Sequence, residues 1–260
     1  MKNKLKEKMI RGEKTLGTFH AIGSAAAVEC LGLAELDYVI IDTEHSPFQI
    51  ESVQSYVRSA KLVGVTPLVR VKNSERHSIL SMLDIGAMGL IIPNVQTVEE
   101  VKKIIQHGKY YPTGERGIAP TSGSSFWYTD YATQGLDHYF QMSNNETLLI
   151  PQCETRGCLE NIEEIVSLEG VDGIFVGPYD LSAALGKPGQ FDDCEVKRAI
   201  EKVLHTCKKF GKFSFIYTGA EADIKKNFEL GFNSVTYNMD AIMLIEAYRR
   251  IVNTYKELSR

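Results

Sequence analysis

The sequence predicts an α/β protein folded as a (β/α)8 TIM barrel. Short β-branched apolar runs alternate with amphipathic helical stretches along all 260 residues, and this alternation favours parallel strands with helices outside them. The apolar runs number about eight, as the barrel requires, and the chain length suits one barrel. In chain order, the expected strands are Leu16–His20, Tyr38–Asp42, Pro67–Val71, Gly89–Pro93, Leu148–Cys153, Gly173–Gly177, Phe213–Tyr217 and Ser234–Asn238. We therefore expect a single domain over residues 1–260.

Helix signals between the expected strands fit the same fold. A capping box from Thr97 to Glu100 opens a segment whose apolar residues recur every three or four positions. Glycine readily adopts the positive φ that often follows a helix, and it stands at the helix ends before several strands. These glycines are Gly64, Gly86, Gly170, Gly211 and Gly231.

Two segments depart from the regular alternation. The connection Tyr110–Glu146 carries Gly, Pro, Ser and aromatic residues with little helical periodicity, and a loop this long usually has a function. The last helix, expected over Asp240–Leu258, offers more apolar surface than one face of a barrel needs. We therefore expect this helix to take part in oligomerisation.

Composition and charge exclude several classes of protein. With 43% hydrophobic and 24% charged residues, a net charge of −4 and no basic cluster, the chain is not expected to bind nucleic acid. The charged segment 1–14 lacks the apolar core of a signal peptide, and no window approaches the roughly 20 apolar residues of a membrane span, so we expect a cytoplasmic protein. The 5 cysteines never occur in CxxC spacing, which argues against structural zinc and a disulfide framework.

Polar residues follow several of the expected strands, where catalytic groups of barrels lie. Glu154 and Asp180 follow neighbouring strands, and two converging carboxylates repel each other unless a cation lies between them. Oxygen-only ligation suits Mg²⁺ or Mn²⁺, and two protein ligands would leave positions open for a chelating substrate. The alternative is that Asp180 caps the short helix Leu181–Leu185 and Glu154 is solvated.

His45 follows the strand that ends at Asp42, so its imidazole is expected at the barrel mouth with a carboxylate near enough to orient it. Such a histidine is a candidate proton shuttle, although it could equally be a loop residue satisfied by the backbone. Arg70 lies inside an apolar strand, where a guanidinium needs an anionic partner, either a structural ion pair or a bound carboxylate or enolate. Lys72, beyond the same strand, is the candidate for a Schiff-base mechanism and is expected at the rim.

Seven short segments, in order and spread over nearly the whole chain, resemble the HpcH/HpaI aldolase family of divalent-metal pyruvate aldolases, which includes hydroxy-oxo-heptanedioate aldolase and 2-dehydro-3-deoxyglucarate aldolase. The combination is specific, whereas each segment alone is weak. The segments are Ile41–His45, Val69–Val71, Leu83–Ala87, Ile92–Gln96, Tyr111–Gly117, Gln152–Arg156 and Gly177–Ser182.

The resemblance implies a role for each matching residue. Glu154 and Asp180 match the ligands of a divalent metal, Mg²⁺ or Mn²⁺ with Co²⁺ as a further candidate, and His45 matches an acid–base histidine supported by Asp42. Arg70 matches an arginine that faces the pyruvate oxygen. The substrate pocket would further comprise Gln152, Gly177, Pro178 and Ser182.

The resemblance also implies an activity and an assembly. The reaction would be the reversible cleavage of a 4-hydroxy-2-oxo acid to pyruvate, or another 2-oxo acid, and an aldehyde through a metal-stabilised enolate. The assembly would be a hexamer in which the last helix is exchanged between neighbours. A lyase acting on a coenzyme A thioester and a non-catalytic barrel that binds an oxo acid are the alternatives.

Departures from the family pattern concern the aldehyde partner. Tyr179 replaces a small residue, Ala119 replaces glycine, and His20 is unfamiliar at the end of the first strand. Between Ile118 and Tyr128 there is no Lys or Arg, and a loop with such composition over the barrel mouth would suit a neutral aldehyde better than one with a distal carboxylate. Alternatively, this loop is only a subunit contact.

Overall fold

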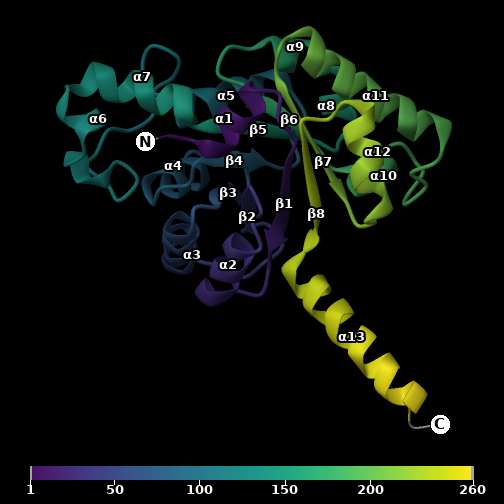
Figure 1. Ribbon diagram of the computed structural model, residues 1–260. Coiled ribbons are helices and arrows are strands. Elements are labelled where there is room, and N and C mark those ends of the chain that lie inside the picture. Colours follow the sequence, from purple (N-terminus) through teal and green to yellow (C-terminus); the bar gives the residue numbers. More distant parts are fainter. Residues whose placement is uncertain (1, 259–260) are drawn as a thin grey trace.

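Eight parallel strands close into a barrel in the computed structural model, which describes residues 2–258 (Figure 1). Each strand pairs with the next in the chain, and β1 pairs with β8 to close the ring. The strands are β1 Thr15–His20, β2 Tyr38–Asp42, β3 Thr66–Arg70, β4 Gly89–Ile92, β5 Leu148–Cys153, β6 Gly173–Val176, β7 Phe213–Thr218 and β8 Ser234–Met239. The predicted barrel is confirmed. Met1, Ser259 and Arg260 of the expected domain 1–260 lie outside the described residues.

Each observed strand end lies within one residue of the predicted one. β3 begins one residue earlier and ends at Arg70, which is paired in register with Asp42 of β2 and Ile91 of β4. β6 ends at Val176, so Gly177 belongs to the turn that follows. Arg70 therefore lies at the carboxyl end of its strand, and Gly177 lies just beyond the end of β6, where groups from different strands converge.

Helices cover the outside of the barrel. The capping box of Thr97 and Glu100 is present, and Gly64 and Gly231 end their helices in the left-handed conformation with φ of 80° and 114°. The other three predicted helix-stop glycines also have positive φ. The helices are α1 Lys4–Ile10, α2 Ala25–Leu33, α3 Ile50–Val63, α4 Arg76–Asp84, α5 Val98–Gly108, α6 Asp130–Thr133, α7 Leu136–Glu146, α8 Arg156–Glu160, α9 Ile162–Ser167, α10 Pro178–Ala184, α11 Cys194–Lys209, α12 Ala222–Leu230 and α13 Asp240–Leu258, with a 3-10 turn at Ser125–Trp127.

Two apolar layers hold this architecture together. An outer layer lies between the strands and the helices, and an inner layer of large side chains fills the barrel, including Tyr38, Phe175 and Phe215. Leu5 and Met9 of α1 join the inner layer, since residues four apart lie on one face of a helix. The interior is therefore a packed core, and open space remains at the mouth.

The expectation of little helical structure in Tyr110–Glu146 was wrong. The segment contains the 11-residue helix α7, whose side chains at Leu136, Tyr139, Phe140 and Ser143 follow the spacing of a helix face. The aromatic residues of α7 pack against another segment, because Phe140 stacks on Tyr110 with ring centroids 4.6 Å apart. The partner that makes α7 a helix lies about 30 residues away, and sequence periodicity does not reveal it.

The loop 118–128 is anchored on the end of α4. Gly123 N donates to Asp84 O at 2.7 Å, and Arg116 Nη2 lies 2.9 Å from Asp84 Oδ1, so this part of the chain packs along α4. Figure 1 shows α6 and α7 standing at the side of the barrel. Residues 118–128 do not line the cavities described at the barrel mouth. Within one chain this loop therefore contributes no residue to the mouth cavities, and the preference for a neutral aldehyde stays a prediction.

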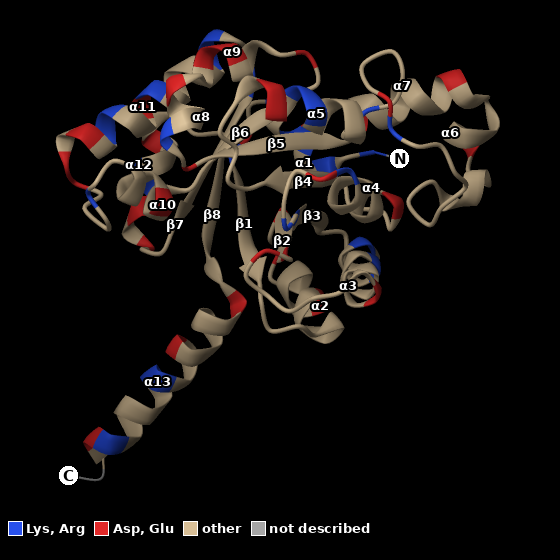
Figure 2. Cartoon of the chain, turned by 180° about the vertical axis from the view of Figure 1, so that it is seen from behind, with Lys and Arg blue, Asp and Glu red and all other residues tan. Residues whose placement is uncertain are grey.

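Helix α13, predicted over Asp240–Leu258, has those bounds in the structure. It extends away from the barrel (Figures 1 and 2). Its exposed apolar side chains include Leu244, Ile245, Tyr248, Ile251 and Val252. Among the helices of residues 2–258, none has the length and apolar character needed to cross a membrane.

Candidate active site

Two adjoining cavities lie at the carboxyl ends of the strands. The inner one, the catalytic cavity, has a volume of about 170 Å³. The outer one, the acidic cavity, has a volume of about 380 Å³ and shares His45 and Asp180 with the inner one. The predicted residues in the catalytic cavity are His45, Arg70, Gln152, Gly177, Pro178 and Asp180, and those in the acidic cavity are His45, Glu154 and Asp180. The barrel thus brings together groups separated by up to 135 positions in the chain.

Carboxylates from three strand ends converge on the acidic cavity. Burial raises the pKa of Glu154, and the neighbouring carboxylates of Glu44 and Asp180 raise it further. The pKa of Glu44 is also raised, first by burial and then by Asp42 and Asp180, in spite of the nearby Arg70. Ionising these groups together is therefore costly, and a cation would relieve the repulsion.

The donor set fits a divalent cation that prefers oxygen ligands. In residues 2–258, no group of three or more His, Cys, Asp or Glu side chains is arranged to hold a metal ion by itself. The prediction uses two protein ligands, Glu154 and Asp180, and leaves the remaining positions to water and substrate. Asp180 is in the first turn of α10 and is exposed.

Three neighbours fix the carboxylate of Glu154. The backbone N–H of Asn94 donates to Oε1 at 2.6 Å, and the side-chain amide of Gln152 donates to Oε2. Asn94 has a φ of 54°, a conformation that asparagine tolerates better than most residues. A Cβ atom at Gly177 would lie 2.9 Å from both Gln152 Nε2 and Glu154 Oε2, so the glycine makes room for this pair.

Gln152 also carries an unsatisfied acceptor. Its Oε1 is buried and has no hydrogen-bond partner, while the residue lines the catalytic cavity. A buried acceptor without a partner is costly unless a ligand or water donates to it. This atom therefore indicates that the catalytic cavity receives a polar molecule.

Arg70 is held at the end of β3 by an ion-pair network. Its Nε and Nη2 donate to the two carboxylate oxygens of Asp42 at 2.9 and 2.7 Å, and Nη1 lies 3.3 Å from Glu44 Oε2. Its guanidinium also lies 4.7 Å from the ring centroid of Phe19. Burial alone would lower the pKa of Arg70, but the hydrogen bonds and charges of Asp42 and Glu44 raise it, so the group remains a cation. Both readings of this arginine are compatible, since it is ion-paired and also lines the catalytic cavity.

His45 lies at the entrance, with its side chain 68% exposed. The neighbouring carboxylate is that of Glu44, whose Oε2 lies 3.7 Å from His45 Nε2. Asp42 instead accepts hydrogen bonds from Arg70 and from the backbone N–H groups of Glu44 and His45. Asp42 thus shapes the turn that carries the histidine rather than contacting its imidazole.

Ser182 and Lys72 are placed away from the chemistry. The hydroxyl of Ser182 donates to Tyr179 O at 2.7 Å and accepts from Gly189 N at 3.0 Å, and the residue is fully buried. Its predicted contact with substrate is therefore corrected, because the hydroxyl is already used to fasten α10 to the following loop and lines neither cavity. Lys72 is exposed beyond the end of β3, at the rim where it was expected.

Glu44 and Asn94 line the acidic cavity but are not among the residues predicted for the site. The position of Glu44 between Asp42 and His45 could have suggested a third carboxylate. Asn94 gave no signal as a single residue, since only its left-handed conformation directs its N–H at Glu154.

The fold and this site define a barrel enzyme whose acidic mouth suits a divalent cation and whose buried arginine suits an anionic substrate. The family model described as HpcH/HpaI aldolase/citrate lyase matches residues 15–247, and the chain belongs to this family. It is a metal-dependent aldolase, a carbon–carbon lyase.

Known proteins resemble the chain over nearly its whole length. A curated 5-keto-4-deoxy-D-glucarate aldolase from Klebsiella pneumoniae subsp. pneumoniae is 32% identical over 255 residues, which cover 98% of this chain and 97% of the relative. The crystal structure of an HpcH/HpaI aldolase from Desulfitobacterium hafniense DCB-2 has a TM-score of 0.90 and 31% identity, covering 97% and 96% of the two chains. The citrate synthase SbnG has a TM-score of 0.89 and 27% identity, covering 99% of each chain.

Proposed function

We propose that the protein cleaves a 4-hydroxy-2-oxo acid to pyruvate and an aldehyde, and joins them in the reverse direction. The observation that carries this proposal is the meeting of the predicted metal ligands with Arg70 and the unsatisfied Gln152 Oε1 at one barrel mouth. The curated relatives are named for 5-keto-4-deoxy-D-glucarate, an oxo acid, which supports an oxo acid as the substrate class.

The residues divide the reaction between them. Glu154 and Asp180 would hold a divalent cation, Mg²⁺ or Mn²⁺ with Co²⁺ as a further candidate, and this ion supplies positive charge to the carboxylate and keto oxygens of the oxo acid. Arg70 donates to the keto oxygen, where negative charge develops as the carbon–carbon bond breaks. Gln152 and the aromatic walls Phe19 and Phe175 orient the small acid and exclude water.

His45 moves the proton. In cleavage, the imidazole takes the proton of the 4-hydroxyl as the bond between C3 and C4 breaks, its electron pair passes to the pyruvate enolate, and the aldehyde leaves. The enolate then takes up a proton at C3 from the protonated His45, directly or through water, which gives pyruvate and restores the neutral imidazole. Glu44, 3.7 Å from Nε2, is suited to stabilise the protonated imidazole.

Decarboxylation of oxaloacetate tests the proposal, because a site that stabilises the pyruvate enolate should release carbon dioxide from this acid. We expect no pyruvate after exhaustive chelation and recovery with Mg²⁺, Mn²⁺ or Co²⁺. Full activity without metal would contradict the proposal and direct attention to Lys72, where borohydride would trap a Schiff base with pyruvate. Binding of oxaloacetate without turnover in the presence of metal would indicate a non-catalytic barrel.

We further propose that α13 docks on a second copy of the chain, within the hexamer that the family resemblance implies. Leu244, Ile245 and Ile251 are 51%, 54% and 61% exposed, and an apolar face of this extent is expected to be covered in solution. Light scattering should show an oligomer at micromolar concentration. Ile245→Asp should shift the protein to smaller species, whereas the charge-neutral control Asn253→Ser should not; a monomeric wild type would contradict the proposal.

A further inference from the structure

A third cavity, with a volume of about 390 Å³, adjoins the catalytic cavity and lies among α10, α11 and α12. We call it the side cavity. It shares Pro178, Tyr179 and Tyr217 with the catalytic cavity, so the same side chains form a wall of both. The catalytic cavity has less than half the volume of the side cavity, and neither the metal-binding prediction nor the proton transfer uses the larger space.

The wall between the two cavities is aromatic. The ring of Tyr179 packs edge-on against Phe191 at 4.8 Å and against Tyr217 at 5.9 Å. A Cβ atom placed on Gly219 would lie 3.6 Å from the Tyr179 hydroxyl and 3.8 Å from the Tyr217 hydroxyl, so no side chain of this residue fills the space below them. Tyr179 is 53% exposed, and an exposed side chain changes rotamer readily. Tyr179 is therefore the part of this wall that can move by rotation of its side chain.

The lining of the side cavity suits an uncharged ligand. Its walls include the apolar side chains Ile200, Ile216 and Leu230. The two cations that line it are each engaged, because Lys197 Nζ lies 2.8 Å from Asp192 Oδ1 and Lys226 Nζ lies 3.8 Å from Asp223 Oδ1. The lining acids Glu201 and Asp223 balance these cations. No unpaired cation is thus presented to a distal carboxylate, whereas an apolar or aromatic group would find a matching surface.

We propose that the side cavity is a subsite for the distal, uncharged part of the aldehyde partner, with an alkyl or aromatic tail as the preferred class. This inference rests on the proposed aldol function, which requires the aldehyde carbon to react in the catalytic cavity and its remaining atoms to leave past Tyr179 and Tyr217. The tail passes from there into the side cavity.

The test compares aldehydes of increasing length in the reaction with pyruvate. From propanal to hexanal, kcat/KM should rise about tenfold or more, because each fully buried methylene contributes up to about a fourfold gain in affinity. Ala220→Trp fills the side cavity from the loop after β7 and should abolish this rise. Ala222→Trp is the matched control, since Ala222 is exposed two residues further on and does not line the cavity.

Two further measurements separate the possible failures. Oxaloacetate decarboxylation should be the same in wild type, Ala220→Trp and Ala222→Trp; its absence in the wild type would contradict the aldol function itself. Calorimetry with the unreactive probe 3-phenylpropan-1-ol should detect one site in the wild type and in Ala222→Trp, and none in Ala220→Trp. A length preference that survives in Ala220→Trp, no length preference in the wild type, or failure of the probe to bind would each overturn the subsite.

Discussion

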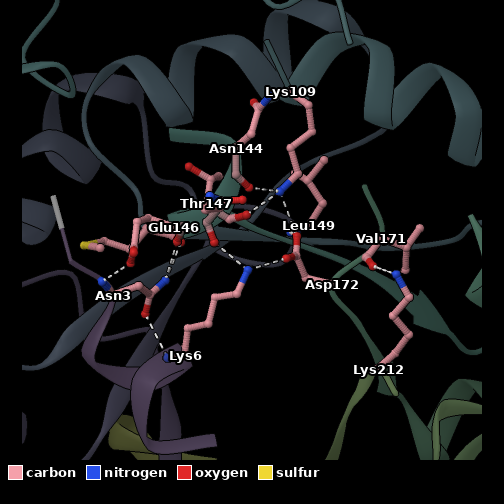
Figure 3. Close-up of polar contacts among 12 residues, drawn as sticks. Asn3, Lys6, Lys109, Asn144, Glu146, Thr147, Leu149, Val171, Asp172 and Lys212 are labelled. Carbon is pink, nitrogen blue, oxygen red and sulfur yellow. Dashed lines mark hydrogen bonds and ion pairs between the residues drawn. The ribbon is translucent and has the colours of Figure 1, made fainter. Parts of the chain in front are cut away.

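The two ends of the barrel both bury charged groups, but they neutralise them very differently. At the amino end of the barrel, the carboxylate of Asp172 accepts hydrogen bonds from Lys6 Nζ and Lys109 Nζ, both at 2.8 Å, and from Leu149 N at 2.9 Å (Figure 3). Lys109 also donates to Asn144 O and Thr147 O. Burial lowers the pKa of Lys109, although Asp172 opposes this effect. Every hydrogen of its ammonium group has an acceptor, which is the condition under which a buried charge is tolerated.

At the carboxyl end of the barrel, negative charges outnumber the positive charges beside them. Glu44, Glu154 and Asp180 converge, and Arg70, which lies 3.3 Å from Glu44, gives two of its hydrogen bonds to Asp42. The pKa values of Glu44 and Glu154 rise as a result of burial and mutual repulsion. The amino end of the barrel thus uses buried charge for stability, whereas the carboxyl end keeps uncompensated charge for a cation and substrate, at a cost in stability.

The sharpest test of this contrast is Glu154→Gln, which should change activity and stability in opposite directions. Oxaloacetate decarboxylation should fall by about 10³-fold or more, because a cation that contributes several kcal/mol is no longer held. Chemical unfolding of the metal-free variant should show equal or higher stability than the wild type. A large loss of stability would mean that Glu154 is a structural group.

At the amino end of the barrel, Asp172→Ala should reduce the free energy of unfolding by about 3–5 kcal/mol, since the buried Lys109 and the half-buried Lys6 lose their carboxylate. Urea unfolding measures this loss. The control Glu229→Ala removes an exposed partner of Lys225 and should stay within about 0.5 kcal/mol of the wild type. A loss for Asp172→Ala as small as that of the control would break the comparison.

His45→Ala should slow aldol cleavage by about 10²–10⁴-fold, as expected for a lost proton-transfer group. Its side chain is 68% exposed, so the free energy of unfolding should change by less than about 0.5 kcal/mol. His77→Ala, at an exposed histidine outside the two mouth cavities, should leave both quantities unchanged. Near-normal cleavage by His45→Ala across the pH range would show that another group moves the proton.

The smallest expected effect is a pH dependence of stability. Because the folded-state pKa values of Glu44 and Glu154 are raised, the folded protein binds more protons than the unfolded one above the ordinary glutamate pKa, and these groups make the metal-free protein less stable as pH rises through their raised values. Glu44→Gln should recover about 1 kcal/mol at neutral pH and little at pH 4. Saturating divalent metal should reduce the difference, and a variant that tracks the wild type at every pH without metal would contradict the repulsion.

Much of the fold could be predicted because strands and helices leave local patterns. The eight apolar runs, the Thr97 capping box and the helix-stop glycines each report a conformation set by near neighbours, and α13 was predicted with its observed bounds. Helix α7 was missed because its face is completed by Tyr110, a contact across the long connection. The sequence does not reveal that the loop 118–128 is anchored on Asp84, because this is a tertiary contact.

The barrel could be predicted from the sequence, and so could the strand ends near which the site residues lie, because a parallel topology puts the residues after each strand at one end. These residues are Asp42, His45, Arg70, Gln152, Glu154 and Asp180. Their partners depend on the tertiary structure. Asp42 is paired with Arg70, and Glu44 lines the acidic cavity. The hydroxyl of Ser182 joins α10 to the loop that follows it, and the N–H of Asn94 donates to Glu154. The physical reason is that hydrogen bonds and charge repulsion act over a few ångströms between segments far apart in the chain, whereas sequence patterns record the preferences of neighbouring residues.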